Sequence, residues 1–267
     1  DVITVGSKNF TENVFLGELI AQQIERETDY QVDRRLNLGG TFLCHQALVS
    51  GEIDVYPEYT GTALTAILEQ PVQRDAAAVY ETVRRAYDEQ LDLVWTRPFG
   101  FSNTFAVLMR AEDHPDVRTL SALAATAPQL AIGFNFEFLE REDGWNGLRE
   151  AYGLAFKGDP VTMDLNLVYQ ALRAGQVDVA IGNSTHGLVE KLDLRILDDD
   201  QSYFPPYNAA PVVRQETLDR YPGLEKALDG LSGRILDAKM RGLNRALDVD
   251  QRRVEEVASA FLATIQP

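Results

Sequence analysis

An internal repeat constrains the fold of this chain more than any other feature. Residues 45–55 read HQALVSGEIDV and residues 169–179 read YQALRAGQVDV. Each copy follows, at a similar distance, a strand that runs into an unusual turn: ITVGSKNFTE from Ile3, and LAIGFNFEFLE from Leu130. A common helix–turn–strand sequence would explain the short match but not the matching flanks. We therefore expect two similar α/β lobes facing a cleft, with a ligand beyond the carboxyl ends of the strands.

The order of the expected elements extends this plan. Strands alternate with helices along the chain, which predicts largely parallel sheets. In the first lobe we expect strands at Val2–Val5, Gln31–Leu36, Ile53–Tyr56 and Leu93–Thr96, and helices at Glu12–Arg26 (with Thr11 as N-cap), Phe42–Ser50, Thr60–Leu68 and Ala76–Gln90. The tail, residues 223–265, reads as almost continuous helix and is expected to pack back on the first lobe.

Two long extended passages are the expected crossovers between the lobes. They cover residues 101–108 and 204–213, and the second contains three prolines. This division places residues 1–105 and 208–267 in lobe 1 and residues 106–207 in lobe 2. Two crossovers make a hinge with modest freedom to open and close.

The acidic composition limits the class of partner. The 267 residues carry a net charge of −16, with a pI of about 4.6. Such a surface argues against nucleic acid, which requires a basic stripe, and against anionic lipid headgroups. It is compatible with a cationic or zwitterionic ligand. No run of eighteen apolar residues is present to span a membrane, and the chain begins at Asp1 directly before a strand, as a mature domain would.

No motif for catalysis, metal or cofactor binding is present. Cys44 is the only cysteine and lies in an apolar helical stretch, which favours a buried packing role. The three histidines lack metal-ligand spacing. A nucleophile elbow, a P-loop and a dinucleotide fingerprint are all missing. We therefore expect no cofactor, no metal and no enzymatic activity.

Three segments carry side chains suited to a small charged ligand. The turn from Ser7 to Glu12 lies between a strand and a helix N-terminus, where Lys8 and free backbone N–H groups favour an anion; an ordinary capped turn is the alternative. Residues 54–62 place two tyrosines at a strand end, where their rings either attract a cation or only pack. Arg141, in the matching turn of the second lobe, either clamps a carboxylate or pairs with its acidic neighbours.

These segments together resemble one family. The resemblance rests on GSKNFTE, LGGT, QAL..GEIDVYPEYTGT, Asn103-Thr104, the FxxRxDG form of Phe138–Gly144, and DD...FPPY at Asp199–Tyr207. They are similar to the substrate-binding proteins of ABC importers for glycine betaine, choline and carnitine, the osmoprotectant-uptake group. The resemblance covers nearly the whole chain. It implies the two-lobed, type II periplasmic-binding-protein fold, which closes around a ligand in the interlobe cleft without chemistry.

The resemblance also implies roles for individual residues. In the family an aromatic cage holds the quaternary ammonium, and basic and hydroxyl groups hold the carboxylate. By motif, Tyr59 is one cage wall and Tyr207 closes the cage from the second crossover. Lys8 and Thr62 face the carboxylate, and Arg141 reaches it from the second lobe.

The chain departs from the family pattern in the remaining ligand-binding candidates. Phe105 stands where the family usually has a tyrosine, and Asn103 where it commonly has an aspartate. Asn183 replaces a cage tyrosine, and His186, either a ligand contact or a polar rim residue, replaces an acidic residue. The site therefore either binds betaines weakly or accepts a larger betaine such as ergothioneine. The full expected set is Lys8, Asn9, Tyr59, Thr62, Asn103, Phe105, Arg141, Asn183, His186 and Tyr207.

The resemblance further implies a place in transport. It predicts a monomer outside the cytoplasm, periplasmic or anchored or fused to a permease, that hands its solute to ABC permease subunits. Two other classes stay open: an enzyme on the same two-lobed fold, and a ligand-sensing domain of a membrane protein.

Overall fold

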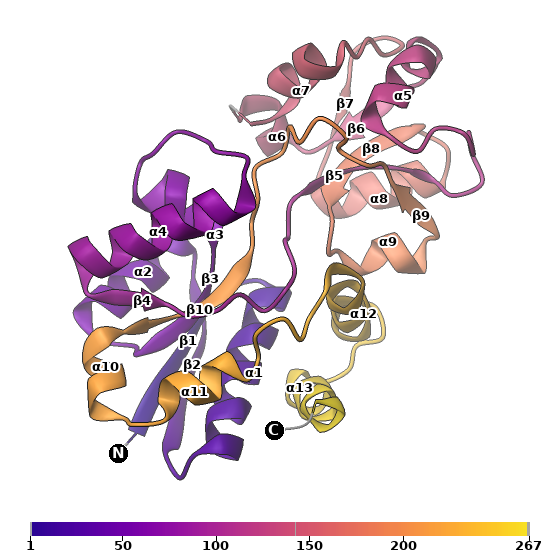
Figure 1. Ribbon diagram of the computed structural model, residues 1–267. Helices are drawn as coiled ribbons and strands as arrows, with labels where there is room; N and C mark the ends of the chain where they lie inside the picture. The colour runs from indigo at the N-terminus through magenta and orange to yellow at the C-terminus, as the bar shows by residue number, and fades with distance from the viewer. Residues whose placement is uncertain (1, 142, 266–267) are drawn as a thin grey trace. The chain divides into compact units, whose positions relative to one another are not determined.

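The computed structural model describes residues 2–141 and 143–265. By its internal contacts the chain divides into two compact units (Figure 1). Residues 1–102 and 206–267 form the first unit, and residues 103–205 form the second. The chain therefore passes between the units twice, after residues 102 and 205. The boundaries expected at residues 105 and 207, and the hinge they imply, stay predictions.

The first unit is built on a five-stranded sheet whose strands come from both ends of the chain (Figure 1). The strands are β1 (Val2–Lys8), β2 (Gln31–Gly39), β3 (Val55–Tyr59), β4 (Leu93–Trp95) and β10 (Ala209–Arg214). Their order in the sheet is β2-β1-β3-β10-β4. Strand β1 runs parallel to β2 and β3, whereas β10 is antiparallel to β3 and β4.

The sheet of the second unit repeats this arrangement strand for strand. Its strands are β5 (Phe105–Arg110), β6 (Ile132–Phe134), β7 (Val161–Thr162), β8 (Val179–Asn183) and β9 (Leu194–Ile196). They follow the order β7-β6-β8-β5-β9. Strand β6 is parallel to β7 and β8, and β5 is antiparallel to β8 and β9. The predicted repetition of one α/β plan is thereby confirmed.

The expectation of largely parallel sheets is wrong in the same place in both units. The antiparallel strands β10 and β5 each follow a segment that crosses from the other unit. Parallel neighbours need a crossover connection, usually a helix, within one sheet. A strand that enters from the other unit has no such connection to its neighbour in the sheet and can run antiparallel to it. Each sheet is therefore mixed.

Helices cover both faces of the first sheet. They are α1 (Thr11–Glu27), α2 (Thr41–Ser50), α3 (Thr60–Thr62), the π-helix η1 (Ala63–Ile67), α4 (Ala76–Leu91), α10 (Gln215–Arg220), α11 (Leu224–Asp229), α12 (Asp237–Asp248) and α13 (Val254–Thr264). One core joins α1 and α11–α13 to the sheet through residues such as Phe15 and Leu228. The other joins α2 and α4 through residues such as Leu48 and Tyr87. Because side chains alternate along a strand, Val212 and Val213 belong to opposite cores.

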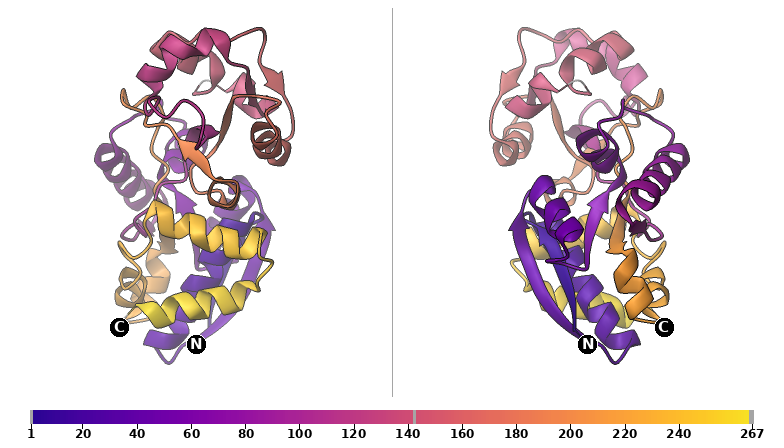
Figure 2. Two further views of the ribbon diagram at one scale, coloured as in Figure 1. Left: turned by 90° about the vertical axis from the view of Figure 1, so that its right-hand side faces the viewer. Right: turned by 90° about the vertical axis from the view of Figure 1, so that its left-hand side faces the viewer.

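The helical tail packs in the first unit, as expected, but it is not continuous. It divides into α11, α12 and α13, and Figure 2 shows α12 and α13 side by side. Gly233 between α11 and α12 has φ of 67°, and Gln251 between α12 and α13 has φ of 54°. Helices α11 and α12 end before these residues, at Asp229 and Asp248, and a left-handed residue prevents a right-handed helix from continuing through the connection. The apolar period continued through these residues, so the sequence did not reveal the breaks.

Three expected elements near the candidate site differ in the structure. Thr11 is the first residue of α1 and not its N-cap, which is Phe10 in an extended conformation. The helix expected at Thr60–Leu68 is a short α-turn followed by a π-helix. The strand expected at Ile53–Tyr56 runs instead from Val55 to Tyr59. Tyr59 is therefore held in the sheet and not in a loop.

The second unit contains shorter helices. They are α5 (Leu120–Thr126), the 3-10 helix η2 (Ala127–Gln129), α6 (Phe136–Glu140), α7 (Trp145–Tyr152), α8 (Leu165–Arg173) and α9 (Gly187–Lys191). Helices α6 and α9 span five residues each, too few to show a helical period, and the sequence did not predict them. One core contains Phe134, Phe138 and Trp145, and the other contains Tyr169 and Leu172.

The aspartate of each repeat copy performs the same structural task. Asp54 Oδ2 accepts a hydrogen bond from the backbone N–H of Thr4 at 2.8 Å, and Asp178 Oδ2 accepts one from Ala131 at 3.0 Å. In return, the aspartate N–H groups donate to the carbonyls of the same partners, both at 2.8 Å. Each aspartate thus joins the loop after the repeat helix to the beginning of the equivalent strand, β1 in the first unit and β6 in the second.

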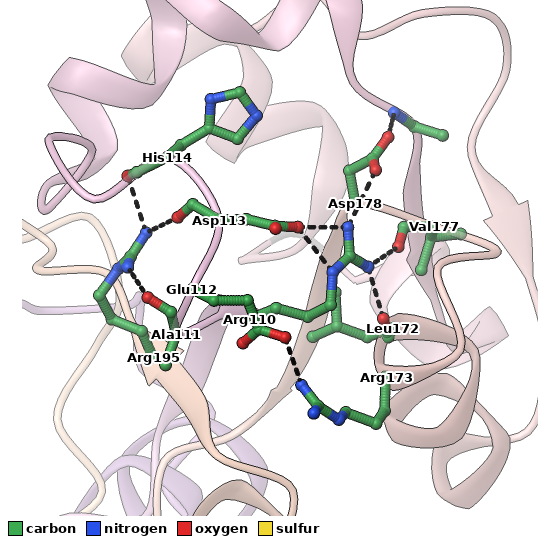
Figure 3. Close-up of polar contacts among 11 residues, drawn as sticks. Arg110, Ala111, Glu112, Asp113, His114, Leu172, Arg173, Val177, Asp178 and Arg195 are labelled. Carbon is green, nitrogen blue, oxygen red and sulfur yellow. Dashed lines mark hydrogen bonds and ion pairs between the residues drawn. The ribbon is translucent and has the colours of Figure 1, made fainter.

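In the second unit Arg110 extends this junction (Figure 3). Its Nη1 donates to the carbonyls of Leu172 at 2.6 Å and Val177 at 2.9 Å. The guanidinium also pairs with Asp113 and, at 3.2 Å, with Asp178. Arg110 therefore ties the end of β5 to the C-terminal end of α8 and to the loop that follows it.

We expect both repeat aspartates to be needed for stability. Asp54→Ala and Asp178→Ala each leave a backbone donor without its acceptor, which costs about 1–3 kcal/mol. Urea unfolding should show this loss for both variants. Asp159→Ala removes an exposed aspartate of the second unit and should change stability by less than about 0.5 kcal/mol. Equal midpoints for Asp178→Ala and Asp159→Ala would contradict the proposed role.

Candidate functional site

Lys8, the predicted anion-binding residue, lies at the end of β1 and is almost fully buried. Its Nζ pairs with Glu58 Oε1 at 2.5 Å and donates to Thr41 Oγ1 at 2.9 Å. Its side chain is 5% exposed, and that of Glu58 is 0% exposed. Lys8 is therefore a fixed cation with an internal counter-charge, and not the solvated lysine of an ordinary turn.

Glu58 is the centre of a buried hydrogen-bond network. Besides Lys8, its carboxylate accepts from Tyr56 Oη at 2.8 Å and from the backbone N–H of Tyr59 at 2.8 Å. A buried carboxylate is tolerated only when paired and hydrogen-bonded, and this one meets both conditions. The network holds β1 and β3 together at the carboxyl end of both strands.

Tyr59, the predicted cage wall, is anchored through its hydroxyl. Its Oη donates to Glu12 Oε1 at 2.8 Å, and Asn244 Nδ2 of α12 donates to Glu12 Oε2 at 2.8 Å. Burial first, and then the Glu12 carboxylate, raises the pKa of Tyr59 well above its usual value. The ring stacks on Phe10 with centroids 6.0 Å apart, and Lys8 Nζ lies 5.3 Å from the ring centroid. The neutral ring thus already faces a cation of the chain.

The other candidates of the first unit lie on the same strand-to-helix segment or against it. A Cβ on Gly61 would lie 2.9 Å from the ring of Tyr207, so this glycine, next to Thr62, allows the approach. The segment is held by Thr60, whose Oγ1 accepts from the backbone N–H of Asn208 at 3.1 Å. Asn9 is exposed, and its backbone N–H donates to the carbonyl of Gly39 at 3.0 Å. The structure therefore brings Tyr207 to Gly61 beside Thr62.

In the second unit Phe105 and Arg141 are in contact. The guanidinium carbon of Arg141 lies 5.1 Å from the Phe105 ring centroid. Phe105 also packs edge-on against Phe138, with centroids 5.0 Å apart. Arg141 Nε and Nη2 donate to Asp143 at 2.7 and 2.8 Å, and Nη1 donates to Glu137 at 3.0 Å. The acidic pairing considered from the sequence is present, and Arg141 also covers an aromatic face.

The remaining candidates lie around strand β8. Asn183, its last residue, pairs with Phe105 across the sheet, and its backbone N–H donates to Tyr169 Oη at 2.8 Å. His186 stacks on Tyr169 at 4.4 Å, and its Nδ1 accepts from the Leu188 N–H as the N-cap of α9. His186 thus has a structural role as a helix cap, and whether it contacts a ligand stays a prediction. Asn103 directly precedes Thr104, whose N–H donates to Ser184 Oγ at 3.0 Å.

Sequence reasoning missed the residues that hold these side chains. Glu12 and Glu58 were within the noted segments but were given no partner. Asn244 lies in the tail helix, 232 positions from Glu12 in the chain, and no local pattern indicates it. Asp143 was recognised only as part of a motif. A buried polar contact between distant segments becomes apparent only in the folded chain.

No arrangement typical of a metal enzyme is found in the described part of the chain. Residues 2–141 and 143–265 contain no group of three or more His, Cys, Asp or Glu side chains that could hold a metal ion. Burial raises the pKa of the Cys44 thiol to about 11, so it is protonated near neutral pH, in keeping with the expected packing role. Among the described helices, none has both the length and the apolar character needed to cross a bilayer.

Comparison with known proteins identifies the family. A family model for the substrate-binding domain of ABC-type glycine betaine transport systems, OpuAC, matches residues 1–264. The chain belongs to this OpuAC family. Its members are binding components of ABC transporters and not enzymes, so the expected family and the expected lack of catalytic function are both confirmed at this level.

Individual OpuAC relatives differ in their ligands. The chain is 36% identical to the glycine-betaine-binding protein of Pseudomonas aeruginosa, over 98% of this chain and 87% of that one. It is 33% identical to the ergothioneine transport permease/ergothioneine binding protein EgtU of Helicobacter pylori, over 97% of this chain. This chain spans about half, 47%, of the length of that relative.

A solved structure establishes the fold class. The crystal structure of a glycine betaine/carnitine/choline ABC transporter superposes with a TM-score of 0.93 at 30% identity, covering 98% of both chains. The predicted two-lobed type II fold is confirmed. The ligand-binding roles of the ten candidate residues stay predictions.

The buried pair in this OpuAC chain gives a test of the first-unit network. Glu58→Gln keeps the shape but leaves Lys8 charged and buried without a counter-charge, which should cost about 3–5 kcal/mol. Glu52→Gln, at an exposed position, makes the same change in net charge and should cost less than about 0.5 kcal/mol. Urea unfolding measures both. If the two variants unfold alike, Lys8 and Glu58 do not form an ionised pair in solution.

Proposed function

We propose that this protein is the extracytoplasmic solute receptor of an ABC importer for a quaternary-ammonium zwitterion of the glycine betaine type. It binds the solute as a monomer, without a cofactor, and delivers it to permease subunits. It is either periplasmic or attached to the cell surface. Fusion to a permease is one form of attachment, and it is supported by the Helicobacter pylori relative, which is about twice as long as the matched region and whose name includes a permease.

The observation that carries this proposal is the pairing of a cation with an aromatic ring in each unit. Lys8 lies 5.3 Å from the Tyr59 ring centroid, and Arg141 lies 5.1 Å from that of Phe105. A small zwitterion presents a carboxylate and an ammonium at a comparably short spacing. The basic groups suit the carboxylate, and the ring faces suit the ammonium. Tyr207 adds a further ring beside Gly61.

A larger betaine such as ergothioneine is the second candidate. Asn183 lies opposite Phe105 in the sheet, where the family pattern has a cage tyrosine. An asparagine there leaves more room and offers hydrogen-bonding groups. The 33% identity to the ergothioneine-binding relative supports this alternative.

Binding should be selective for the trimethylammonium group. We expect isothermal titration of folded, ligand-free protein to give heat with glycine betaine, carnitine or ergothioneine, and none with glycine. The physical reason is that the methyl groups spread charge over a large apolar surface that fits ring faces. The absence of heat with all betaines and with choline would overturn the proposal. Heat with ergothioneine alone would favour the second candidate.

Phe105 should contribute a measurable part of the affinity. Phe105→Leu removes one cation–π contact, worth roughly 0.5–2 kcal/mol, and should weaken binding about two- to thirtyfold. Phe105→Tyr should retain the affinity. Phe136→Leu is the matched control, because Phe136 is 62% exposed on α6 in the same unit. If Phe105→Leu and Phe136→Leu have equal dissociation constants, Phe105 is no cage wall.

A further inference from the structure

Among the described residues, two carboxylates of different character bind Arg141. Asp143, whose side chain is 7% exposed, accepts two hydrogen bonds from Nε and Nη2, at 2.7 and 2.8 Å. Glu137, whose side chain is 63% exposed, accepts one bond from Nη1 at 3.0 Å. A bidentate bond to a buried carboxylate is strong and fixes orientation. A single bond to an exposed carboxylate is weak and easily exchanged.

The backbone keeps the Asp143 contact in place. Asn135 caps α6 by accepting from the Phe138 N–H at 3.1 Å, and Arg141 follows the helix in an extended conformation. The Gly144 N–H then donates to the Arg141 carbonyl at 3.1 Å. A Cβ on Gly144 would lie 2.0 Å from the Phe138 carbonyl oxygen, so the turn requires glycine. This turn presents Asp143 to Nε and Nη2 of Arg141. The remaining nitrogen, Nη1, faces the exposed side chain of Glu137.

We propose that Glu137 is a specificity-determining residue that competes with the ligand carboxylate for Arg141. This inference rests on the proposed function, in which Arg141 binds that carboxylate. Asp143 is then the positioning residue, which keeps the guanidinium over Phe105. Binding of a zwitterion exchanges the Glu137 carboxylate for the ligand carboxylate at Nη1, with no change in the number of charge pairs.

The exchange has a consequence for selectivity. A zwitterion must displace Glu137, whereas a cation without a carboxylate, such as choline, has nothing to gain from Arg141 Nη1. Glu137 therefore weakens the binding of zwitterions and leaves that of choline unaffected or strengthened by its negative charge. The ratio of the two dissociation constants reports on Glu137 specifically, since a general effect on folding would change both.

The test is a titration of glycine betaine and choline into the wild type, Glu137→Gln and Glu140→Gln. Glu140 is exposed on the same helix, so its variant makes the same charge change next to Arg141. An exposed pair of this kind corresponds to about a two- to fivefold change in affinity. We expect Glu137→Gln to bind glycine betaine about two- to fivefold more tightly, without tighter binding of choline, and Glu140→Gln to match the wild type. The gain should shrink at about 1 M salt, where the Debye length falls to roughly 3 Å.

The outcomes separate this inference from the function on which it rests. If the wild type binds glycine betaine but Glu137→Gln and Glu140→Gln give the same ratio of dissociation constants, the role of Glu137 is overturned and the receptor function stands. A gain that is equal for betaine and choline also overturns it, since it indicates a structural effect. If the wild type binds neither ligand, nor carnitine or ergothioneine, both the function and the inference fail.

Discussion

The buried Lys8–Glu58 pair is the interaction on which the first unit depends. It joins the end of β1 to β3 and, through Thr41, to the start of α2. Charges inside a protein cost several kcal/mol each unless geometry and hydrogen bonds compensate them. Tyr56 and the backbone of Tyr59 supply those bonds. We therefore expect the pair to add little net stability. Its main effect is to favour this one arrangement of β1, β3 and α2 over others.

That arrangement positions the aromatic ring of the candidate site. Tyr59 N–H binds Glu58, and its hydroxyl binds Glu12, so both ends of the residue are fixed. Glu12 is in turn held by Asn244 of α12. The tail helices thus do more than cover the apolar face of α1, because one of them sets the acceptor for the tyrosine hydroxyl. A change in the packing of α12 would therefore affect the Tyr59 ring, because hydrogen bonds link Asn244 to Glu12 and Glu12 to Tyr59.

The repeat made much of the fold predictable, and its failures have physical causes. The matched helix–turn–strand copies predicted two units of one plan, because Gly51 and the equivalent Gly175, with φ of 79° and 74°, end the helices in the same way. The antiparallel direction of strands β5 and β10 was not predicted, since it depends on the crossings between units and not on local sequence. Of the site, the strand-end tyrosines and Arg141 could be named from motifs. Glu12, which binds the Tyr59 hydroxyl, and Asn244, which binds Glu12, could not be paired from the sequence, because their contact is set by tertiary packing.

Both units place a cation next to an aromatic ring, but the cation is buried in the first unit and partly exposed in the second. Each sets a cation about 5 Å from an aromatic centroid, but the Lys8 side chain is 5% exposed and that of Arg141 is 32% exposed. A buried cation in a closed network cannot change partners without leaving Glu58 unpaired, which is costly. A half-exposed guanidinium fixed on one edge can change partners on the other. The first unit thus holds its ring rigidly, whereas Arg141 in the second unit keeps one edge of its guanidinium on an exchangeable partner, as the proposed competition between Glu137 and the ligand carboxylate requires.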